Sequence, residues 1–207
     1  MTLTKNYNLQ FLKKSRLKAG DVFAVSIDNS YLFGRVVRSK LPFGESPFGG
    51  SNLIYLYNVR SSNAEIDYSM LTPDRLLIPP MYVSDILWSQ GYAKKIVNLP
   101  VSEKDLLPQH CFYSPAHDSY YDDKGVKLSR KIEPCGEWIY VVGLDYIDNK
   151  ISDALHIKRA PLTEGSMWYM PGKGEKIWLT KSLEELKKYR NYDEIIEKYP
   201  EVVEGDA

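Results

Sequence analysis

The residues best suited to chemistry lie near the middle of the chain, where His110, Cys111, His117 and Asp118 are close in sequence. Imidazole, thiolate and carboxylate groups are the usual ligands of zinc, and a cysteine near a histidine can act as a nucleophile. Neighbouring residues on a strand point to opposite faces, so His110 and Cys111 are poorly placed to hold one ion. We therefore expect no metal site and no cofactor, with Cys111 buried and both histidines exposed or hydrogen-bonded.

Cys135 is a second candidate nucleophile, because Pro134 and Gly136 place it in an expected turn. Its neighbours Glu133 and Glu137 would raise the pKa of the thiol and make it less reactive. The chain has three histidines and no His-x-His pair, and it is shorter than the roughly 250 residues of a typical barrel hydrolase. We assign no catalytic residue.

The elements that would position these residues are mostly strands. Residues 22–27 and 31–37 are rich in β-branched and aromatic side chains, and the polar residues Asp28, Asn29 and Ser30 separate them, which predicts a hairpin. Further strands are expected over 52–59, 75–80, 109–113, 138–142 and 177–179, a second hairpin over 82–97, a turn at 122–125, and helices over 147–157 and 182–199, the last broken near Asn191.

The first hairpin also carries a resemblance. The run Gly20-Asp21-Val22-Phe23-Ala24-Val25, a short turn and then Tyr31-Leu32-Phe33-Gly34-Arg35-Val36-Val37 resembles the N-terminal motif of the immunity protein 26 family of bacterial polymorphic toxin systems. The resemblance covers about residues 15–100 and includes Leu87–Tyr92. It implies a protein that binds a cognate toxin and blocks it, and it brings no catalytic residues, although some similar proteins carry a phosphotriesterase label.

The expected fold is mainly β, of the α+β class. It consists of a strongly bent sheet or small SH3-like barrel, then a second β section and C-terminal helices. We expect one domain over residues 1–207, with the N-terminal β section in 1–100 and the second β section and helices in 101–207. In the first section, Gly20 and Asp21 are expected to shape the entry to the strand, and Gly34 to permit close packing.

Composition argues against several partners. There are 27 basic and 27 acidic side chains, so the chain has no overall charge that would attract nucleic acid or an anionic membrane. No apolar run is long enough for a signal peptide or a membrane helix, so we expect a cytoplasmic protein. Two cysteines are too few for a disulfide framework, and a reducing compartment would keep them as thiols.

The sixteen tyrosines indicate where a partner would bind. Tyr31, Tyr55, Tyr57 and Tyr140 lie in strand-like runs and are expected to pack in the sheet, whereas Tyr113, Tyr120, Tyr121, Tyr189 and Tyr192 have polar neighbours. Many antibacterial toxins are nucleases with basic clefts, which an acidic and aromatic face could occupy. The residues expected to form that face are Tyr120, Tyr121, Asp122, Asp123, Tyr192, Asp193 and Glu194.

Two other functions stay open at this point. Small β-barrels bind RNA with aromatic and basic side chains on one face, and Phe23, Tyr31, Phe33, Arg35 and Arg38 could be arranged in that way. A phosphotriesterase-like hydrolase is the other alternative. The sequence does not specify the toxin or the oligomeric state.

Overall fold

The computed structural model describes residues 7–42, 48–162 and 183–198. They fall into two compact units: one is Leu9–Ile147, and the other comprises the described residues of Met1–Asn8 and Asp148–Ala207. The protein is mostly β, with 35% strand and 20% helix, and its sheet is a strongly curled half-barrel. The predicted class, a mainly β protein with a strongly bent sheet and C-terminal helices, is confirmed. The prediction of one domain over the whole chain stays a prediction.

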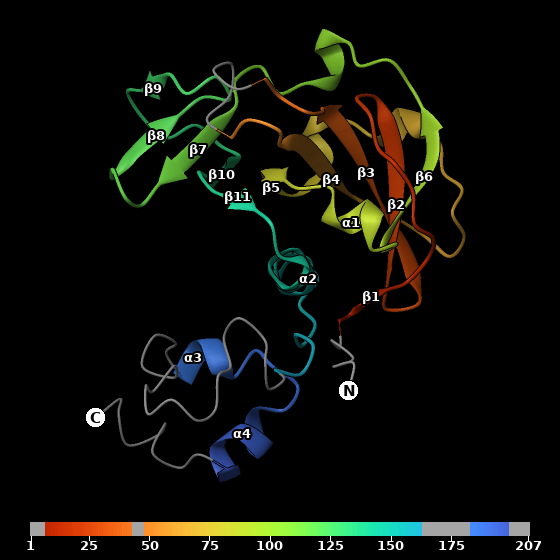
Figure 1. Cartoon of the computed structure of the whole chain (residues 1–207), viewed down its shortest axis with the longest axis vertical. Coiled ribbons are helices and arrows are strands. Elements are labelled where there is room, and N and C mark those ends of the chain that lie inside the picture. Colours follow the sequence, from red (N-terminus) through yellow and green to blue (C-terminus); the bar gives the residue numbers. More distant parts are fainter. Residues whose placement is uncertain (1–6, 43–47, 163–182, 199–207) are drawn as a thin grey trace. The chain divides into compact units, whose positions relative to one another are not determined.

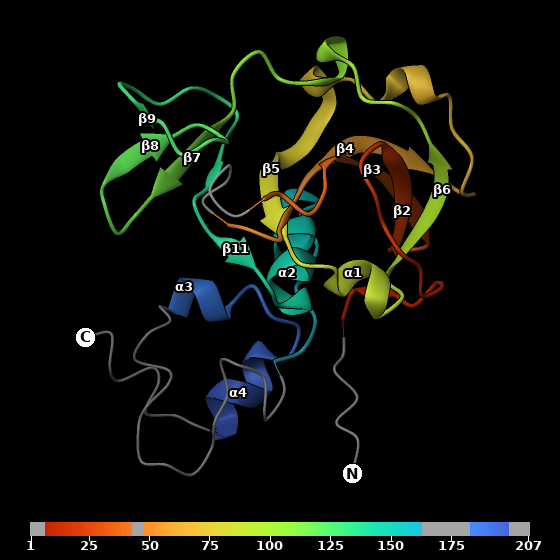
Figure 2. The same ribbon diagram turned by 45° about the horizontal axis from the view of Figure 1, so that its top comes forward.

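The half-barrel belongs to the first unit and has the strand order β1-β2-β3-β4-β5-β11, with β6 also paired to β2. Figure 2 shows β5, β4, β3, β2 and β6 following one another around an arc. Its strands are β1 (Leu9–Gln10), β2 (Asp21–Ile27), β3 (Ser30–Arg38), β4 (Asn52–Ser61), β5 (Leu76–Val83), β6 (Ala93–Asn98) and β11 (Tyr140–Val141).

A smaller sheet of four strands, in the order β10-β7-β8-β9, lies beside the half-barrel in the same unit (Figure 1). Its strands are β7 (Cys111–Ser114), β8 (Ser119–Tyr121), β9 (Lys127–Leu128) and β10 (Cys135–Glu137). The strand pairs β7–β8 and β8–β9 are antiparallel, whereas β7 and β10 run parallel. The turn predicted at residues 122–125 is present and joins β8 to β9.

Short helices connect the strands, and further helices occur toward the C-terminus. They are η1 (Tyr68–Met70), η2 (Pro73–Arg75), α1 (Ile86–Ser89), η3 (Glu103–Asp105), α2 (Leu144–Ala154), α3 (Leu183–Leu186) and α4 (Tyr192–Lys198). None of the helices in the described part of the chain has both the length and the hydropathy to cross a bilayer. The break predicted near Asn191 is confirmed by the gap between α3 and α4. Ser182 and the predicted strand over 177–179 lie outside the described residues.

The first hairpin forms as predicted, with a tighter turn. Ile27 pairs with Ser30, so only Asp28 and Asn29 form the loop, with φ of 50° and 56°. Two consecutive residues with positive φ match the right-handed twist of the flanking strands, and Asp and Asn tolerate this conformation better than most residues. The local sequence therefore determines the register of β2 against β3.

This turn carries a prediction about stability. Asn29→Gly is expected to raise the free energy of unfolding by about 0.5 kcal/mol, because glycine reaches positive φ without steric cost. The same change at Asn58, an exposed residue within β4, should lower it by about 0.5–1 kcal/mol. Urea unfolding of both variants measures the difference. Equal effects at the two sites would contradict the turn geometry.

Two predictions between residues 75 and 97 are wrong. The prolines do not end β5, which continues through Pro79 and Pro80 to Val83. Residues Ile78 and Met81 pair with β4 on either side of a register irregularity, so the ladder does not require a donor from the prolines. The predicted hairpin over 82–97 is replaced by helix α1 and by β6, which pairs with β2 instead of β5.

The core of the first unit consists largely of aromatic side chains that pack against one another. Tyr55, Tyr57 and Tyr82 have no exposed surface, and Phe23 packs edge-on against Trp88 with ring centroids 5.0 Å apart. The predicted sheet packing is thus confirmed for Tyr55 and Tyr57. Tyr140 departs from it, because 38% of its surface is exposed at the edge strand β11.

The second unit has its own small apolar cluster, formed by Leu162, Leu186, Tyr189 and Ile195. Tyr189 is buried here, so the expectation that it belongs to a binding surface is wrong. Its ring lies 5.3 Å below the guanidinium of Arg159, which forms ion pairs with Asp153 and Glu185. Tyr189 lies between α3 and α4, where its backbone forms an isolated parallel β-bridge with Arg159.

Candidate partner-binding surface

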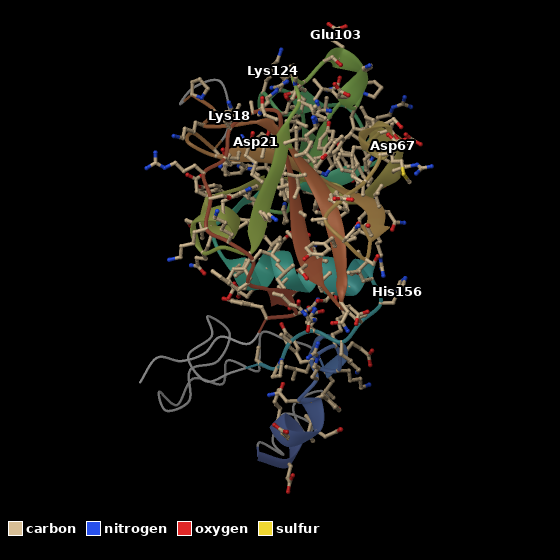
Figure 3. The ribbon with its side chains drawn as sticks, turned by 90° about the vertical axis from the view of Figure 1, so that its right-hand side faces the viewer. Lys18, Asp21, Asp67, Glu103, Lys124 and His156 are labelled. Carbon is tan, nitrogen blue, oxygen red and sulfur yellow. The ribbon has the colours of Figure 1, made fainter. Side chains whose placement is uncertain are left out.

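The residues of the Gly-Asp pair at the start of β2 serve the fold. Gly20 has φ of +84°, and a Cβ there would lie 2.5 Å from the carbonyl oxygen of Leu99. The wholly buried carboxylate of Asp21 accepts hydrogen bonds from the Lys18 amide at 2.9 Å and the Asn98 side chain at 2.7 Å. Figure 3 shows Lys18 and Asp21 close together at this entry. Both residues therefore shape the entry to the strand, as predicted.

The polar groups most like those of an active site form a buried, hydrogen-bonded chain between the half-barrel and the small sheet. The hydroxyl of Tyr55 lies 2.6 Å from His110 Nε2, and His110 Nδ1 lies 3.4 Å from Asp123 Oδ1. Arg38 Nη1 completes the chain 2.5 Å from Asp123 Oδ2. The Tyr55 hydroxyl also accepts a hydrogen bond from the Leu107 amide.

This order of groups is similar to a catalytic relay, but burial argues for a structural role. Tyr55, His110 and Asp123 are 0%, 4% and 6% exposed, so a substrate cannot reach them. Burial raises the pKa of Tyr55 to about 12, which keeps the phenol protonated. Burial would also raise the pKa of Asp123, but His110 and Arg38 outweigh it and hold that pKa below its usual value. The network acts as a fixed polar contact between the sheets.

The other histidines do not assemble a metal site. His117 is exposed, and its Nδ1 lies 2.9 Å from the hydroxyl of Ser114. His156 is exposed and belongs to the second unit. Within residues 7–42, 48–162 and 183–198, no three His, Cys, Asp or Glu side chains come close enough to hold an ion.

Cys135 is a poor nucleophile in this structure. Burial, together with the adjacent Cys111 and Glu133, raises the pKa of its thiol to about 12. The direction predicted from the nearby carboxylates is confirmed, but burial is the larger cause. The proximity of the two cysteines, 24 residues apart in sequence, was not anticipated.

The outer face of the small sheet carries a different set of residues. Tyr113 pairs with Tyr120, Tyr113 with Glu137, and Tyr120 with Leu128. Residues directly opposite one another share a face of a sheet, so these four form one surface, which we call the tyrosine face. All four are half-buried or exposed. The face is therefore accessible to another protein.

The tyrosine face is held in a defined geometry. The rings of Tyr113 and Tyr120 lie 5.3 Å apart between centroids, and the Tyr113 hydroxyl donates to Asp118 at 2.8 Å. That hydrogen bond raises the pKa of Tyr113 above its ordinary value. Glu137 accepts a hydrogen bond from the hydroxyl of Tyr146. Large side chains already fixed in position lose little entropy when a partner binds, which favours affinity.

The neighbouring residues of the expected acidic face have other roles. Tyr121 points to the opposite side of the sheet, where its ring lies 4.7 Å from that of Trp138. Asp122 accepts hydrogen bonds from the amides of Lys124 and Val126 and so stabilises the turn. Asp123 is buried in the polar chain, so the expectation that it lies on a binding face is wrong. The sequence pattern could not show that this carboxylate turns inward.

Tyr192, Asp193 and Glu194 belong to the second unit, in the first turn of α4. Asp193 and Glu194 are exposed, and Tyr192 packs partly against the apolar cluster of that unit. Their predicted role in binding stays a prediction. Of the seven residues expected to bind a partner, Tyr120 is the one on the tyrosine face.

Most of the residues expected to bind RNA are buried or paired with acidic side chains. Phe23 and Phe33 have no exposed area, and Arg35 is 4% exposed, paired with Asp105 at 3.1 Å. Arg38 is engaged by Asp123. Stacking on bases needs exposed rings and free cations, which these residues do not supply.

The chain matches the model of a known protein family. The model of the family described as immunity protein 26 matches residues 18–123, from the approach to β2 to the polar chain at Asp123. Both Tyr113 and Tyr120 lie within the matched region. No curated protein and no solved structure matches the chain.

Proposed function

Because the chain belongs to the immunity protein 26 family, we propose that it neutralises a cognate toxin by binding it directly, with the tyrosine face as the contact surface. The family itself suggests a toxin-neutralising role and is typically non-enzymatic. The observation that carries the choice of surface is the accessible pair Tyr113 and Tyr120 on an ordered sheet. Binding would cover the active surface of the toxin and exclude its substrate.

The chemistry of the matched region supports binding over catalysis. This region contains several buried ionisable side chains that form ion pairs, among them Asp21, Arg35 and Asp123. They stabilise the sheets. The tyrosine face, in contrast, offers apolar rings with polar hydroxyls at their tips, a combination that is enriched in protein interfaces.

Affinity at this surface is expected to depend more on burial than on charge. Asp123 is buried and paired with Arg38, and Asp122 uses one carboxylate oxygen to hold the β8–β9 turn, so the acidic steering expected from the sequence has less basis there. A partner of this face would bury the tyrosine rings against its own apolar groups. Its binding should therefore change only modestly with salt concentration.

The test begins with the protein encoded by the neighbouring gene, which is first assayed for binding to this chain. Tyr120→Ala is expected to raise the dissociation constant of the complex roughly 30-fold, the effect of losing a central aromatic contact. Isothermal titration calorimetry measures the change, and urea unfolding checks that the variant stays folded. Tyr68→Ala is the matched control, because Tyr68 is also exposed but lies in η1, next to Asp67 and away from Lys124 of the β8–β9 turn (Figure 3).

The possible outcomes separate the function from the surface. Tight binding of wild type that Tyr120→Ala leaves unchanged would reject the tyrosine face and retain the function. No binding and no protection of the toxin's target would reject the function itself.

A further inference from the structure

The two cysteines of the chain lie next to one another on adjacent strands of the small sheet. Cys111 on β7 and Cys135 on β10 are register partners in adjacent parallel strands, and their sulfur atoms lie 3.4 Å apart. Both are free thiols. Cys111 is 1% exposed, whereas Cys135 is half-buried, so a reagent in solution reaches Cys135 first.

We propose that Cys111 and Cys135 form an oxidation site that closes into an intramolecular disulfide between β7 and β10. Adjacent strands lie about 4.8 Å apart, which is within the usual Cα separation of disulfide-bonded residues, about 4.4–6.8 Å. The sulfur atoms need to approach from 3.4 Å to about 2 Å, a movement that side-chain rotation can supply. The site is inferred from the two cysteines alone and does not rest on the proposed function.

The oxidant is a small-molecule disulfide such as glutathione disulfide. The thiolate of Cys135 attacks one of its sulfur atoms, breaks the S–S bond and releases one glutathione thiolate, which takes up a proton. The thiolate of Cys111 then attacks the Cys135 sulfur of the mixed disulfide and releases the second glutathione. Two protein thiols are oxidised, one glutathione disulfide is reduced to two thiols, and both protein protons end on the released glutathiones.

The surroundings of the pair determine how it behaves. The high pKa of Cys135, caused first by burial, makes the thiolate scarce at neutral pH, so oxidation is slow and accelerates as the pH rises. Thiols that resist ionisation are also poor leaving groups, so the disulfide is difficult to reduce once formed. The site therefore responds to sustained oxidation, not to brief changes in the thiol pool.

Closing this bond would affect the tyrosine face. The disulfide encloses residues 111–135, which include β8, β9 and Tyr120. A covalent link between β7 and β10 restricts the ways in which this segment can open. Oxidation is expected to fix the sheet in the geometry described here.

The experiment uses the full chain in glutathione buffers of increasing oxidised-to-reduced ratio, followed by alkylation and intact mass measurement. Loss of about 2 Da identifies the disulfide, and its position needs no mapping because the chain has only two cysteines. In native buffer, half-oxidation is expected at a ratio about 100-fold lower than in 6 M guanidinium, because the fold holds the two sulfur atoms together.

Cys135→Ser is the matched control. It should show no 2 Da loss in native buffer, and Cys111 should stay unmodified because it is buried. Two results would overturn the proposal: a wild-type mixed disulfide with glutathione that accumulates without resolving, or half-oxidation at the same ratio in native and denaturing buffer.

Discussion

Gly34→Ala is expected to lower the free energy of unfolding by about 3 kcal/mol, an unusually large effect for the addition of one methyl group. A Cβ at this position in β3 would lie 2.3 Å from Cζ of Phe23 and 2.7 Å from the carbonyl oxygen of Tyr55. Phe23 is fully buried against Trp88 and cannot move aside freely. The Tyr55 carbonyl belongs to β4, so moving it would disturb the β3–β4 ladder. Urea unfolding at neutral pH measures the loss.

A double-mutant cycle identifies the clash. Phe23→Leu removes the ring atoms nearest to the new methyl group, so Gly34→Ala should cost at least about 1 kcal/mol less in that background than in wild type. The residual cost reflects the Tyr55 carbonyl, which Phe23→Leu leaves in place. A loss below about 1 kcal/mol in wild type would show that the core can accommodate the methyl group, and the same loss in both backgrounds would show that the Phe23 ring is not the source of the clash.

Local features of the sequence were sufficient for the first hairpin and for Gly34. Strand residues on both sides of Asp28 and Asn29 determine the pairing of β2 with β3, and a glycine within an apolar strand indicates close packing. The C-terminal helices followed in the same way from a periodic stripe that fails near Asn191. In each case, the interactions that decide the structure lie within a few residues.

Non-local pairing explains the errors. The prolines of β5 suggested a stop, but a register irregularity in β4 makes their missing amide donors unnecessary. The run 93–97 looked like the second strand of a local hairpin, yet it pairs with β2, some 70 residues earlier in the chain. Partners so far apart leave no signature in the local pattern, and strand propensity alone cannot select between them.

The candidate site was predicted only in part for the same reason. Tyr120 and Asp123 are three residues apart, and both looked like surface residues in a polar stretch. The carboxylate of Asp123 is drawn inward by Arg38 and His110, which come from other strands and loops. Cys111 and Cys135 likewise meet only because β7 and β10 are adjacent in parallel. Side-chain direction at this sheet depends on tertiary contacts.

Asp123→Ala is expected to lower the free energy of unfolding by about 3 kcal/mol at neutral pH. Removing one member of a buried ion pair leaves the other charge without compensation, which typically costs about 3–5 kcal/mol. The side chain of Arg38 is 33% exposed and can recover some hydration, which places the effect at the lower end. His110 also loses the acceptor next to Nδ1. Urea unfolding at pH 7 measures the change.

Acid unfolding provides the sharper test of the same carboxylate. The pKa of Asp123 is lower in the folded protein than its ordinary value of 3.8, so the unfolded chain binds this proton more tightly. The stability that Asp123 contributes is therefore present above about pH 4 and is lost as the pH falls through the folded-state pKa. Asp123→Asn keeps the size of the side chain and removes the titration. Wild type and variant should differ most near neutral pH, and the difference should shrink as the pH falls below about 4. A difference that stays constant from pH 7 into this acid range would mean that the folded protein does not stabilise the charged form.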